Sequence, residues 1–470
     1  MTTLSGNASL KEELKAKYVG KTLYEVPTPS CVLDLAKLES NCERMLDATQ
    51  KLDILWRPHI KTHKTTELTR LQVGDTLTTP VHILVSTVLE AENILPLLEE
   101  YKSKGRAVNV LFAFPLFPSA VYRLAAISSA LGPDGLSVMI DHPDQLIPAS
   151  HITQISGYPP LAFLKIDVGY GRAGVVLGSD PYQQLVDAVL DAERRGDCRL
   201  HGLYAHAGQS YGLRKDWAEA MKLLAAEFDP LYRAAQHIRS RGGDTKGEMV
   251  LTVGATPTAS SVQHPTLLEG AAEGPMQELR GVFKEYREAG FNLELHAGVY
   301  ATLDLQQLAT HSRVGMSADD IAISVMAEVA SVYPGRGPEG RTEALVNAGC
   351  LALGREPVTD KGDPPGKDYN GWGMLTPWRL GHYEPINSDF PREHGGWQVS
   401  RISQEHGILL WNGPKDDERK APLKVGQRVR IWPNHSCIAG ACFDYYFIVD
   451  SRNKGREEVV IDVWPRWRGW

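Results

Sequence analysis

The alternation of short apolar runs with longer amphipathic segments is the feature that most restricts how this chain can fold. Between about residues 50 and 305, a run rich in β-branched residues ends in polar or glycine residues, and a helical stretch usually follows. We count eight such units, with strands expected at 54–59, 82–86, 109–114, 136–140, 162–168, 200–205, 249–253 and 293–296. Strands that alternate with helices pair in parallel, so eight of them predict an α/β fold of the (β/α)8 TIM-barrel type.

Amphipathic helices are expected between these strands, for example at 89–102, 119–130, 182–195 and 217–239. The alternative α/β architecture is a doubly wound open sheet, which binds phosphate groups at a glycine-rich turn after an early strand. No glycine-rich phosphate turn follows an early strand in this sequence. The pattern therefore favours the barrel.

The pattern changes after about residue 315, where strand-like runs follow one another without regular helices. These runs lie at 321–333, 342–353, 397–402, 427–432, 445–449 and 459–464, and a long polar connection rich in Gly and Pro occupies 356–396. Such a connection indicates a functional or mobile loop. The sequence thus predicts an N-terminal segment over 1–49 that partly packs with the β domain, a barrel over 50–315 and a β-rich domain over 316–470.

Composition excludes several classes of partner. The net charge of -7 at pH 7 argues against a nucleic acid or an anionic membrane surface. No run reaches the roughly 18 apolar residues of a membrane helix, and the N-terminus lacks the apolar core of a signal peptide. The six cysteines form neither a disulfide framework nor a C-x-x-C pair. These features predict an intracellular protein that is cytoplasmic by default.

Polar residues gather directly after the expected barrel strands, at the end where barrel enzymes hold their active sites. His59, Lys61 and His63 follow the first strand, and the stretch DVGYGRAG follows the fifth. YAHAGQSY follows the sixth strand, GATPT the seventh and HAGVY the eighth. Polar residues without a function would be distributed over both ends of a barrel. Their clustering at one end therefore predicts that the barrel is catalytic.

The stretch RPHIKTHK at 57–64 places two lysines and two histidines where the first strand ends. A lone lysine is usually a surface residue, but neighbouring cations and partial burial disfavour the charged form of an amine. A neutral amine can attack an aldehyde and form an imine. Lys61 is therefore the candidate Schiff-base amine, whereas His63 and Lys64 can equally be solvated turn residues.

Other residues at this end have both a functional and a structural interpretation. The turn Gly254-Ala255-Thr256 can cradle a phosphate with its N–H groups and the Thr256 hydroxyl, although many βα turns look similar. Arg172 follows a glycine-rich bend and can reach over the site or form an ordinary salt bridge. The aromatic candidates, each of which can also be a packing residue, are Tyr204, Tyr211 and Tyr300.

A second cluster, PNHSC at 433–437, follows the strand expected at 427–432. On an extended segment, His435 and Cys437 would point to the same side, and imidazole with thiolate suits zinc, whereas magnesium prefers oxygen ligands. Two protein ligands leave the other zinc positions open, as catalysis requires. The alternative is a core cysteine beside a satisfied histidine. The motif SQEHG at 403–407 can support such a site or form a turn.

Together these motifs resemble those of the D-serine dehydratase / D-threonine aldolase family, which has the alanine-racemase-like fold of pyridoxal-phosphate proteins. RPHIKTHK, KIDVGYGRAG, YAHAGQSY, the Gly254 turn, SQEHG and PNHSC occur in this order, and the resemblance runs from about Thr28 to the C-terminus. It implies pyridoxal 5'-phosphate on Lys61, with Arg172 at the ring hydroxyl, and Zn2+ on His435 and Cys437. Further cofactor-binding residues are expected to be His59, Tyr204, His206, Tyr211, Gly254, Ala255, Thr256 and Tyr300.

The resemblance also implies an activity. D-threonine aldolases tend to carry Asp where this chain has Cys437, so the cysteine points to the dehydratase branch. That branch converts D-serine to pyruvate and ammonia by α,β-elimination, with zinc activating the β-hydroxyl leaving group. The alternatives on the same scaffold are a D-threonine aldolase and a D-threo-3-hydroxyaspartate dehydratase.

Two further alternatives belong to other functional classes. A non-enzymatic pyridoxal-phosphate binding protein would typically lack the β domain and the metal pair. A structural zinc protein would need about four ligands in closed spacing, which the sequence does not offer. The family resemblance also implies a head-to-tail homodimer. The connection at 356–396 is longer than expected for the family, which leaves the breadth of substrate preference open.

Overall fold

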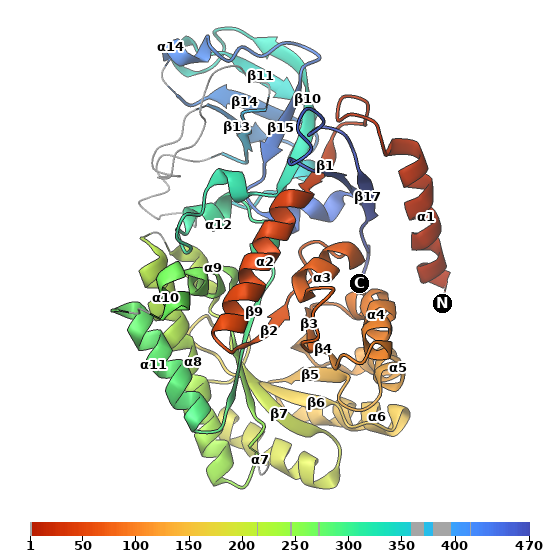
Figure 1. Ribbon diagram of the computed structural model, residues 1–470, viewed down its shortest axis with the longest axis vertical. Helices are drawn as coiled ribbons and strands as arrows, with labels where there is room; N and C mark the ends of the chain where they lie inside the picture. Colours follow the sequence, from red (N-terminus) through yellow and green to blue (C-terminus); the bar gives the residue numbers. More distant parts are fainter. Residues whose placement is uncertain are drawn as a thin grey trace. The chain divides into compact units, whose positions relative to one another are not determined.

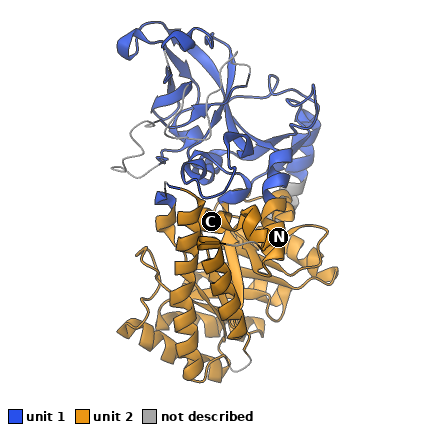
Figure 2. Cartoon of the chain, turned by 60° about the vertical axis from the view of Figure 1, so that its left-hand side comes forward, with its two compact units in different colours: residues 1–42, 211–215, 299–466 blue, residues 43–210, 216–298, 467–470 orange. Residues whose placement is uncertain are grey.

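The computed structural model describes residues 2–213, 215–244, 247–270, 273–358, 371–378, 396–413 and 415–470. The chain forms two compact units (Figure 2). Unit 1 comprises Met1–Cys42, Tyr211–Lys215 and Val299–Arg466, and unit 2 comprises Glu43–Ser210, Asp216–Gly298 and Trp467–Trp470. Unit 1 is therefore assembled mainly from the two ends of the sequence. None of the helices in the described parts of the chain combines the length and the apolar character of a membrane span.

Unit 2 contains the predicted barrel. Its strands are β2 (Leu55–Pro58), β3 (Val81–Val85), β4 (Val108–Pro115), β5 (Leu136–Ile140), β6 (Leu161–Lys165), β7 (Arg199–Tyr204), β8 (Val250–Val253) and β9 (Asn292–Ala297). They pair in parallel in the order β2-β9-β8-β7-β6-β5-β4-β3. A parallel bridge between His59 and Leu84 joins the two ends of this order. The (β/α)8 expectation is confirmed.

Helices alternate with these strands (Figure 1). They are α3 (Thr66–Val73), α4 (Val88–Ser103), α5 (Val121–Leu131), α6 (Leu146–Ser156), α7 (Asp180–Arg195), α8 (Trp217–Ser240) and α11 (Pro275–Glu288). Side-chain hydroxyls begin several of them: Thr65 caps α3, Thr87 caps α4 and Ser179 caps α7, each accepting from an N–H of the first turn. The helices bury one apolar face, which in α7 includes Tyr182, Leu185, Val186 and Val189.

The barrel interior consists of a polar layer and an apolar layer. Arg57 donates from Nε to Glu294 over 2.7 Å and from a terminal nitrogen to Asn109 over 2.8 Å, and all three side chains are buried. Leu84 lies two residues after His82 on β3, and Leu111 lies two residues after Asn109 on β4. Each leucine therefore lies on the same face of its strand as the polar residue before it. The apolar cluster is Leu84, Leu111, Met139, Phe163, Tyr204 and Val250. Because Tyr204 ends β7, this cluster underlies the catalytic end of the barrel.

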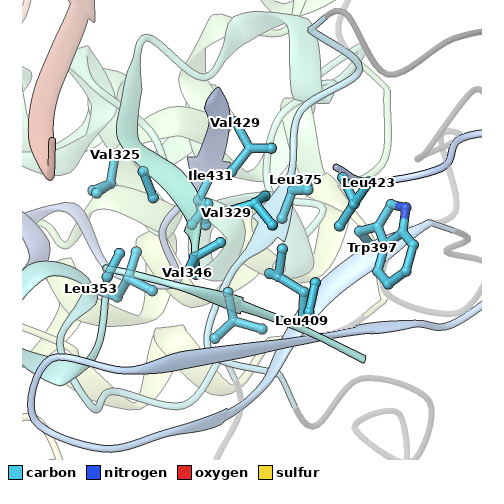
Figure 3. Close-up of a cluster of buried hydrophobic side chains, with 14 of the residues drawn as sticks. Val325, Val329, Val346, Leu353, Leu375, Trp397, Leu409, Leu423, Val429 and Ile431 are labelled. Carbon is cyan, nitrogen blue, oxygen red and sulfur yellow. The ribbon is translucent and has the colours of Figure 1, made fainter. Parts of the chain in front are cut away.

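Unit 1 contains the β-rich domain. Its strands are β1 (Ser30–Asp34), β10 (Ile323–Tyr333), β11 (Glu343–Val346), β12 (Met374–Leu375), β13 (Trp397–Ile402), β14 (Gly407–Trp411), β15 (Arg428–Trp432), β16 (Tyr445–Val449) and β17 (Asp462–Pro465). Their order is β11-β14-β13-β12-β15-β10-β1-β16-β17, and β11 also pairs with β10, so six strands close on themselves. The buried side chains of this closed part include Val325, Val346, Trp397 and Leu409 (Figure 3). The expected β-rich second domain is confirmed.

Some expected boundaries in unit 1 are wrong. The strand expected at 342–353 ends at Val346, and Cys350–Leu353 form the short helix α13. Its first N–H groups donate to the carbonyls of Ser403 and Gln404 instead of to a neighbouring strand. The strands β1, β12 and β14 were not predicted. Most of the connection at 356–396 lies outside the described residues, which include only 356–358, 371–378 and 396 of it.

Candidate active site and metal site

Lys61 lies in the turn that follows β2, at the carboxyl end of the barrel strands. Backbone hydrogen bonds hold this turn: His59 N–H donates to Ala297 O over 2.8 Å, and Lys64 N–H donates to Ile60 O over 2.9 Å. The Lys61 side chain is half-buried. The turn is thereby fixed both to the neighbouring strand β9 and to itself.

His59 is a buried neutral imidazole beside Lys61. Burial, the Lys61 charge and two neighbouring histidines hold the pKa of His59 well below its usual value. Its Nδ1 accepts from the Lys61 N–H over 3.4 Å, so Nε2 carries the hydrogen and donates to Ser86 Oγ over 3.0 Å. His59 therefore adds polarity but no positive charge to the surroundings of the amine.

His63 and Lys64 are not solvated turn residues. His63 is buried, and its ring nitrogens lie 3.0 Å from Thr65 Oγ1 and 3.0 Å from Gln72 Oε1. Lys64 Nζ forms an ion pair of 3.1 Å with the buried Glu90 carboxylate. Both side chains are thus engaged in holding the turn to α3 and α4, which leaves Lys61 as the reactive candidate of the motif.

Tyr204, His206 and His296 form a stack of rings at the same end of the barrel. The rings of Tyr204 and His296 are parallel at 4.3 Å, and those of His206 and His296 are 6.3 Å apart. Burial, followed by the charges of Arg172 and Lys61, lowers the pKa of His206 to about 3. His206 Nδ1 donates to Gly254 O over 2.8 Å, so its Nε2 is an acceptor at neutral pH.

His296 begins the stretch HAGVY after the eighth predicted strand, and the sequence motifs assign no role to it. Its Nδ1 lies 3.0 Å from Thr252 Oγ1, and its buried Nε2 has no hydrogen-bond partner among the described residues. A buried polar atom without a partner is costly. This ring nitrogen therefore marks a place where a bound group would supply the missing hydrogen bond.

Lys165 is a functional candidate that sequence reasoning missed. Burial and then the Arg172 charge lower the pKa of Lys165 to about 8, and its Nζ lies 4.5 Å from the Tyr204 ring centroid. The expected strand at 162–168 extended three residues too far, because β6 ends at Lys165. A predicted strand that ends at Lys165 places this lysine at the active end of the barrel, whereas a strand over 162–168 places it in the strand interior.

Arg172 follows a glycine-rich turn that Asp167 organises. One Asp167 oxygen accepts from the N–H groups of Gly169, Tyr170 and Gly171 over 3.0, 3.1 and 3.1 Å. The exposed Arg172 guanidinium lies 5.3 Å from the Tyr170 ring centroid. Its charge also lowers the pKa values of His206 and Lys165, which places it beside this group of residues.

The turn after β8 approaches its neighbours too closely for any residue but glycine at its first position. Gly254 has φ +143°, and a Cβ there would lie 2.3 Å from His296 O. Ala255 N–H donates to Thr258 Oγ1 over 3.1 Å, and the stretch through the short helix α9 (Thr256–Ser260) is buried. Such close backbone approach suits a turn that wraps an anion.

The expected cofactor-binding residues divide between the two units. His59, Lys61, Arg172, Tyr204, His206 and the Gly254–Thr256 turn belong to unit 2. Tyr211 is half-buried in the 3-10 segment η3 (Gly208–Gly212), and Tyr300 is buried in η5 (Val299–Ala301); both belong to unit 1.

His435 and Cys437 follow β15 in unit 1. The expectation of an extended segment is wrong beyond His435, because Ser436–Ala439 form the helix α15. The two side chains nevertheless hydrogen-bond to each other: burial alone would lower the pKa of His435, but the Cys437 thiolate and then Asp304 raise it to about 9. Within the described residues no group of three or more His, Cys, Asp and Glu side chains is placed to hold a metal. The first four residues of SQEHG, 403–406, form the exposed turn between β13 and β14, and Gly407 begins β14.

Comparison with known proteins identifies the family. A family model described as a putative serine dehydratase domain matches residues 322–449. D-serine dehydratase of Schizosaccharomyces pombe is 38% identical over 465 residues, which cover 98% of this chain and 96% of that protein. The chain belongs to the D-serine dehydratase family. It is therefore an enzyme of the lyase class, and the family resemblance of its motifs is confirmed.

Solved structures support the same fold. A cysteine-to-alanine mutant of D-threo-3-hydroxyaspartate dehydratase in the metal-free form is 26% identical, with a TM-score of 0.70, and covers 96% of this chain and 100% of that one. An alanine-racemase-like protein from Idiomarina loihiensis is 23% identical, with a TM-score of 0.68, over 95% of this chain and 99% of that one. The expected alanine-racemase-like fold is confirmed.

Proposed function

We propose that this enzyme converts D-serine to pyruvate and ammonia, with pyridoxal 5'-phosphate on Lys61 and zinc on His435 and Cys437. One observation carries the proposal: Lys61 lies among buried neutral imidazoles at the active end of a barrel. The chain around it is 38% identical to a D-serine dehydratase.

The residues of the barrel end fit pyridoxal phosphate. Lys61 supplies an amine, the Gly254 turn supplies close backbone, and Nε2 of His296 is a buried polar atom that lacks a partner. The positive charge of Arg172 also favours an anionic phosphate or carboxylate. When bound, pyridoxal phosphate supplies an electron sink for the charge left on the substrate α-carbon.

The side chains around Lys61 have distinct proposed roles. Lys61 Nζ takes the α-proton of the amino acid. Within the described parts of the chain Lys61 forms no ion pair, whereas the other lysine of the motif, Lys64, pairs with Glu90. His206 Nε2 is held as an acceptor by the bond from Nδ1 to Gly254 O. Arg172 attracts and orients anionic groups. The neutral imidazoles of His59 and His206 add no positive charge of their own beside Lys61.

The donor set of His435 and Cys437 fits zinc, because imidazole nitrogen and thiolate sulfur are zinc ligands and leave its other positions open. His435 Nδ1 lies 2.7 Å from Gln306 Oε1, which leaves Nε2 for a metal. When bound, zinc supplies a Lewis acid for the β-hydroxyl of the substrate. The thiolate of Cys437 would lower the charge that the ion presents.

A second candidate substrate has a specific observation in its favour. The structural relative at 26% identity is a D-threo-3-hydroxyaspartate dehydratase, so the scaffold can serve a substrate with a second carboxylate. Product analysis separates the candidates: D-serine gives pyruvate, D-threo-3-hydroxyaspartate gives oxaloacetate, and aldol cleavage of D-threonine gives glycine and acetaldehyde. A homodimer, measurable by light scattering, and a cytoplasmic location remain predictions.

The deciding experiment measures pyruvate release by the purified full-length protein from D-serine and, in parallel, from L-serine. Each assay is run as purified, after chelation and after zinc is restored, together with the visible spectrum. We expect a coloured protein that releases pyruvate from D-serine alone, loses activity on chelation and regains it with zinc. A coloured protein that releases no pyruvate contradicts the substrate assignment, and a colourless one contradicts the cofactor.

A further inference from the structure

The PNHSC segment is held by a second segment of unit 1, residues 303–306. Leu305 N–H donates to Pro433 O over 3.2 Å, and Gln306 N–H donates to Asn434 O over 3.0 Å. Ser436 N–H donates in turn to a carboxylate oxygen of Asp304 over 2.8 Å. The two segments therefore form a short ladder, although they lie more than a hundred residues apart in the sequence.

The side chain of Gln306 meets His435 at the centre of this ladder. Gln306 Oε1 lies 2.7 Å from His435 Nδ1. An amide oxygen only accepts hydrogen bonds, so Nδ1 must carry the hydrogen. In the neutral ring that metal binding requires, the lone pair then resides on Nε2, and rotation of the ring about its bond to Cβ would break the hydrogen bond.

Asp304 contacts both segments of this ladder. It is fully buried, it caps helix α12 (Leu305–Ala309) by accepting from Gln307 N–H over 2.8 Å, and it lies 3.8 Å from His435 Nδ1. Its position fixes the backbone from which Gln306 projects. Hydrogen bonds of the main chain thus hold both segments from which the Gln306 and His435 side chains project.

We propose that Gln306 is a positioning residue of the metal site, which fixes the tautomer and the ring plane of His435 so that Nε2 faces the zinc. The inference rests on the proposed zinc site and adds a residue that no motif of the sequence contains. Partners of this kind, which hold the second nitrogen of a ligating histidine, raise the affinity of a site for its metal.

The test compares Gln306→Leu, Gln306→Glu and a matched control, Gln427→Leu, in the full-length protein. The Gln427 side chain likewise accepts a hydrogen bond, in its case from the backbone N–H of Lys424 over 3.0 Å and in a different turn. The measured quantity is the dissociation constant for zinc, obtained by competition with a chromophoric chelator. We expect Gln306→Leu to weaken zinc binding by about 10- to 100-fold, and Gln306→Glu, which keeps the acceptor, to bind at least as tightly as the wild type.

The rescue by glutamate separates positioning from a general structural role, because a packing defect would not be repaired by a new charge. Zinc affinity of Gln306→Leu within about twofold of the wild type overturns the proposal, and so does a Gln306→Glu protein as weak as Gln306→Leu. If Gln306→Leu does not fold, Gln306→Asn, whose shorter amide cannot reach Nδ1, takes its place with the same expected loss.

The same titrations keep the two proposals apart. A wild-type protein that binds no zinc overturns the metal site and with it the role of Gln306. If the wild type binds zinc, Cys437→Ser loses it and Gln306→Leu keeps it, the metal site stands and only the role of Gln306 is overturned.

Discussion

The catalytic end of the barrel and the metal segment are built in opposite ways. At the barrel end, the relevant groups come from separate strands: Lys61 follows β2, Lys165 ends β6, Tyr204 ends β7, and Gly254 follows β8. The metal pair comes from a single stretch, PNHSC, that a second stretch holds through a few hydrogen bonds.

This difference has consequences for how each site fails. A parallel barrel collects residues from distant parts of the sequence because its strands all end on one side. Several buried rings there surround one reactive amine, so most substitutions should weaken the site and only one should abolish it. The metal pair has no such redundancy, so loss of either ligand should empty the site while the barrel end stays intact.

The largest effect is expected for Lys61→Ala. Removal of the amine should lower kcat/KM for D-serine by about 10⁴-fold, and it should abolish the visible absorbance of bound cofactor. The matched control is Lys64→Ala, which removes an ion pair with Glu90 and should lower the melting temperature but keep the absorbance. Equal absorbance in both variants would remove Lys61 from its proposed role.

A smaller, pH-dependent effect on the free energy of unfolding is expected for Glu227→Gln, which tests whether the Glu227 carboxyl is shielded from solvent. Glu227 is buried on α8; burial raises its pKa to about 8, against weaker opposite effects of Thr258 and the Gly254 backbone. The unfolded carboxyl titrates near ~4.3. Wild-type stability should therefore fall as pH rises from about 4.3 to about 8, because only the folded state still binds the proton in that window.

Glu227→Gln lacks this titration. Its free energy of unfolding should equal that of the wild type near pH 4 and exceed it by up to about 4 kcal/mol at pH 8. Denaturant unfolding at several pH values measures the difference. A difference that does not change with pH would mean that the Glu227 carboxyl is solvated.

Cys437→Ser tests the lack of redundancy at the metal segment. Loss of the thiolate should weaken zinc binding by more than the roughly 100-fold typical of an outer partner, and it should reduce D-serine turnover in parallel. The visible absorbance of the barrel-bound cofactor should remain. Cys442→Ser, at an exposed cysteine of the same unit, should change neither quantity. Full turnover by a zinc-free Cys437→Ser protein would remove zinc from the mechanism.

The smallest effect is expected for Gly254→Ala, compared with Gly178→Ala. Both glycines have positive φ, but an added Cβ is unobstructed at Gly178 and lies 2.3 Å from His296 O at Gly254. Gly178→Ala should cost about 1 kcal/mol of unfolding free energy, and Gly254→Ala about 2 kcal/mol more. Gly254→Ala alone should weaken cofactor binding. Equal costs would show that the turn relaxes freely.

The barrel could be predicted because its signal is local. Most of the eight strands contain a short apolar run, and several of the candidate site residues directly follow those runs. Lys165 was missed because Ile166 and Val168 extend the apolar run beyond the true end of β6. Sequence patterns do not report where a strand leaves its sheet.

The support of the metal pair could not be predicted, because it depends on contacts between distant segments. Gln306 and His435 are 129 positions apart, and neither Asp304 nor Gln306 stands in a motif that marks a ligand. The strand β12, with two residues, is too short to show any periodicity. The PNHSC motif identifies the ligands by their chemistry, whereas the residues that orient them appear only once the chain is folded.

The central claim is that Lys61 and not Lys165 is the amine that holds pyridoxal phosphate. Burial lowers the pKa of Lys165 to about 8 and makes it a credible competitor. The direct test is borohydride reduction of the native holoenzyme, followed by proteolysis and mass spectrometry. The pyridoxyl group is predicted on the peptide that contains Lys61, with the peptide of Lys165 unmodified. A pyridoxyl group on Lys165 would contradict the account of this site.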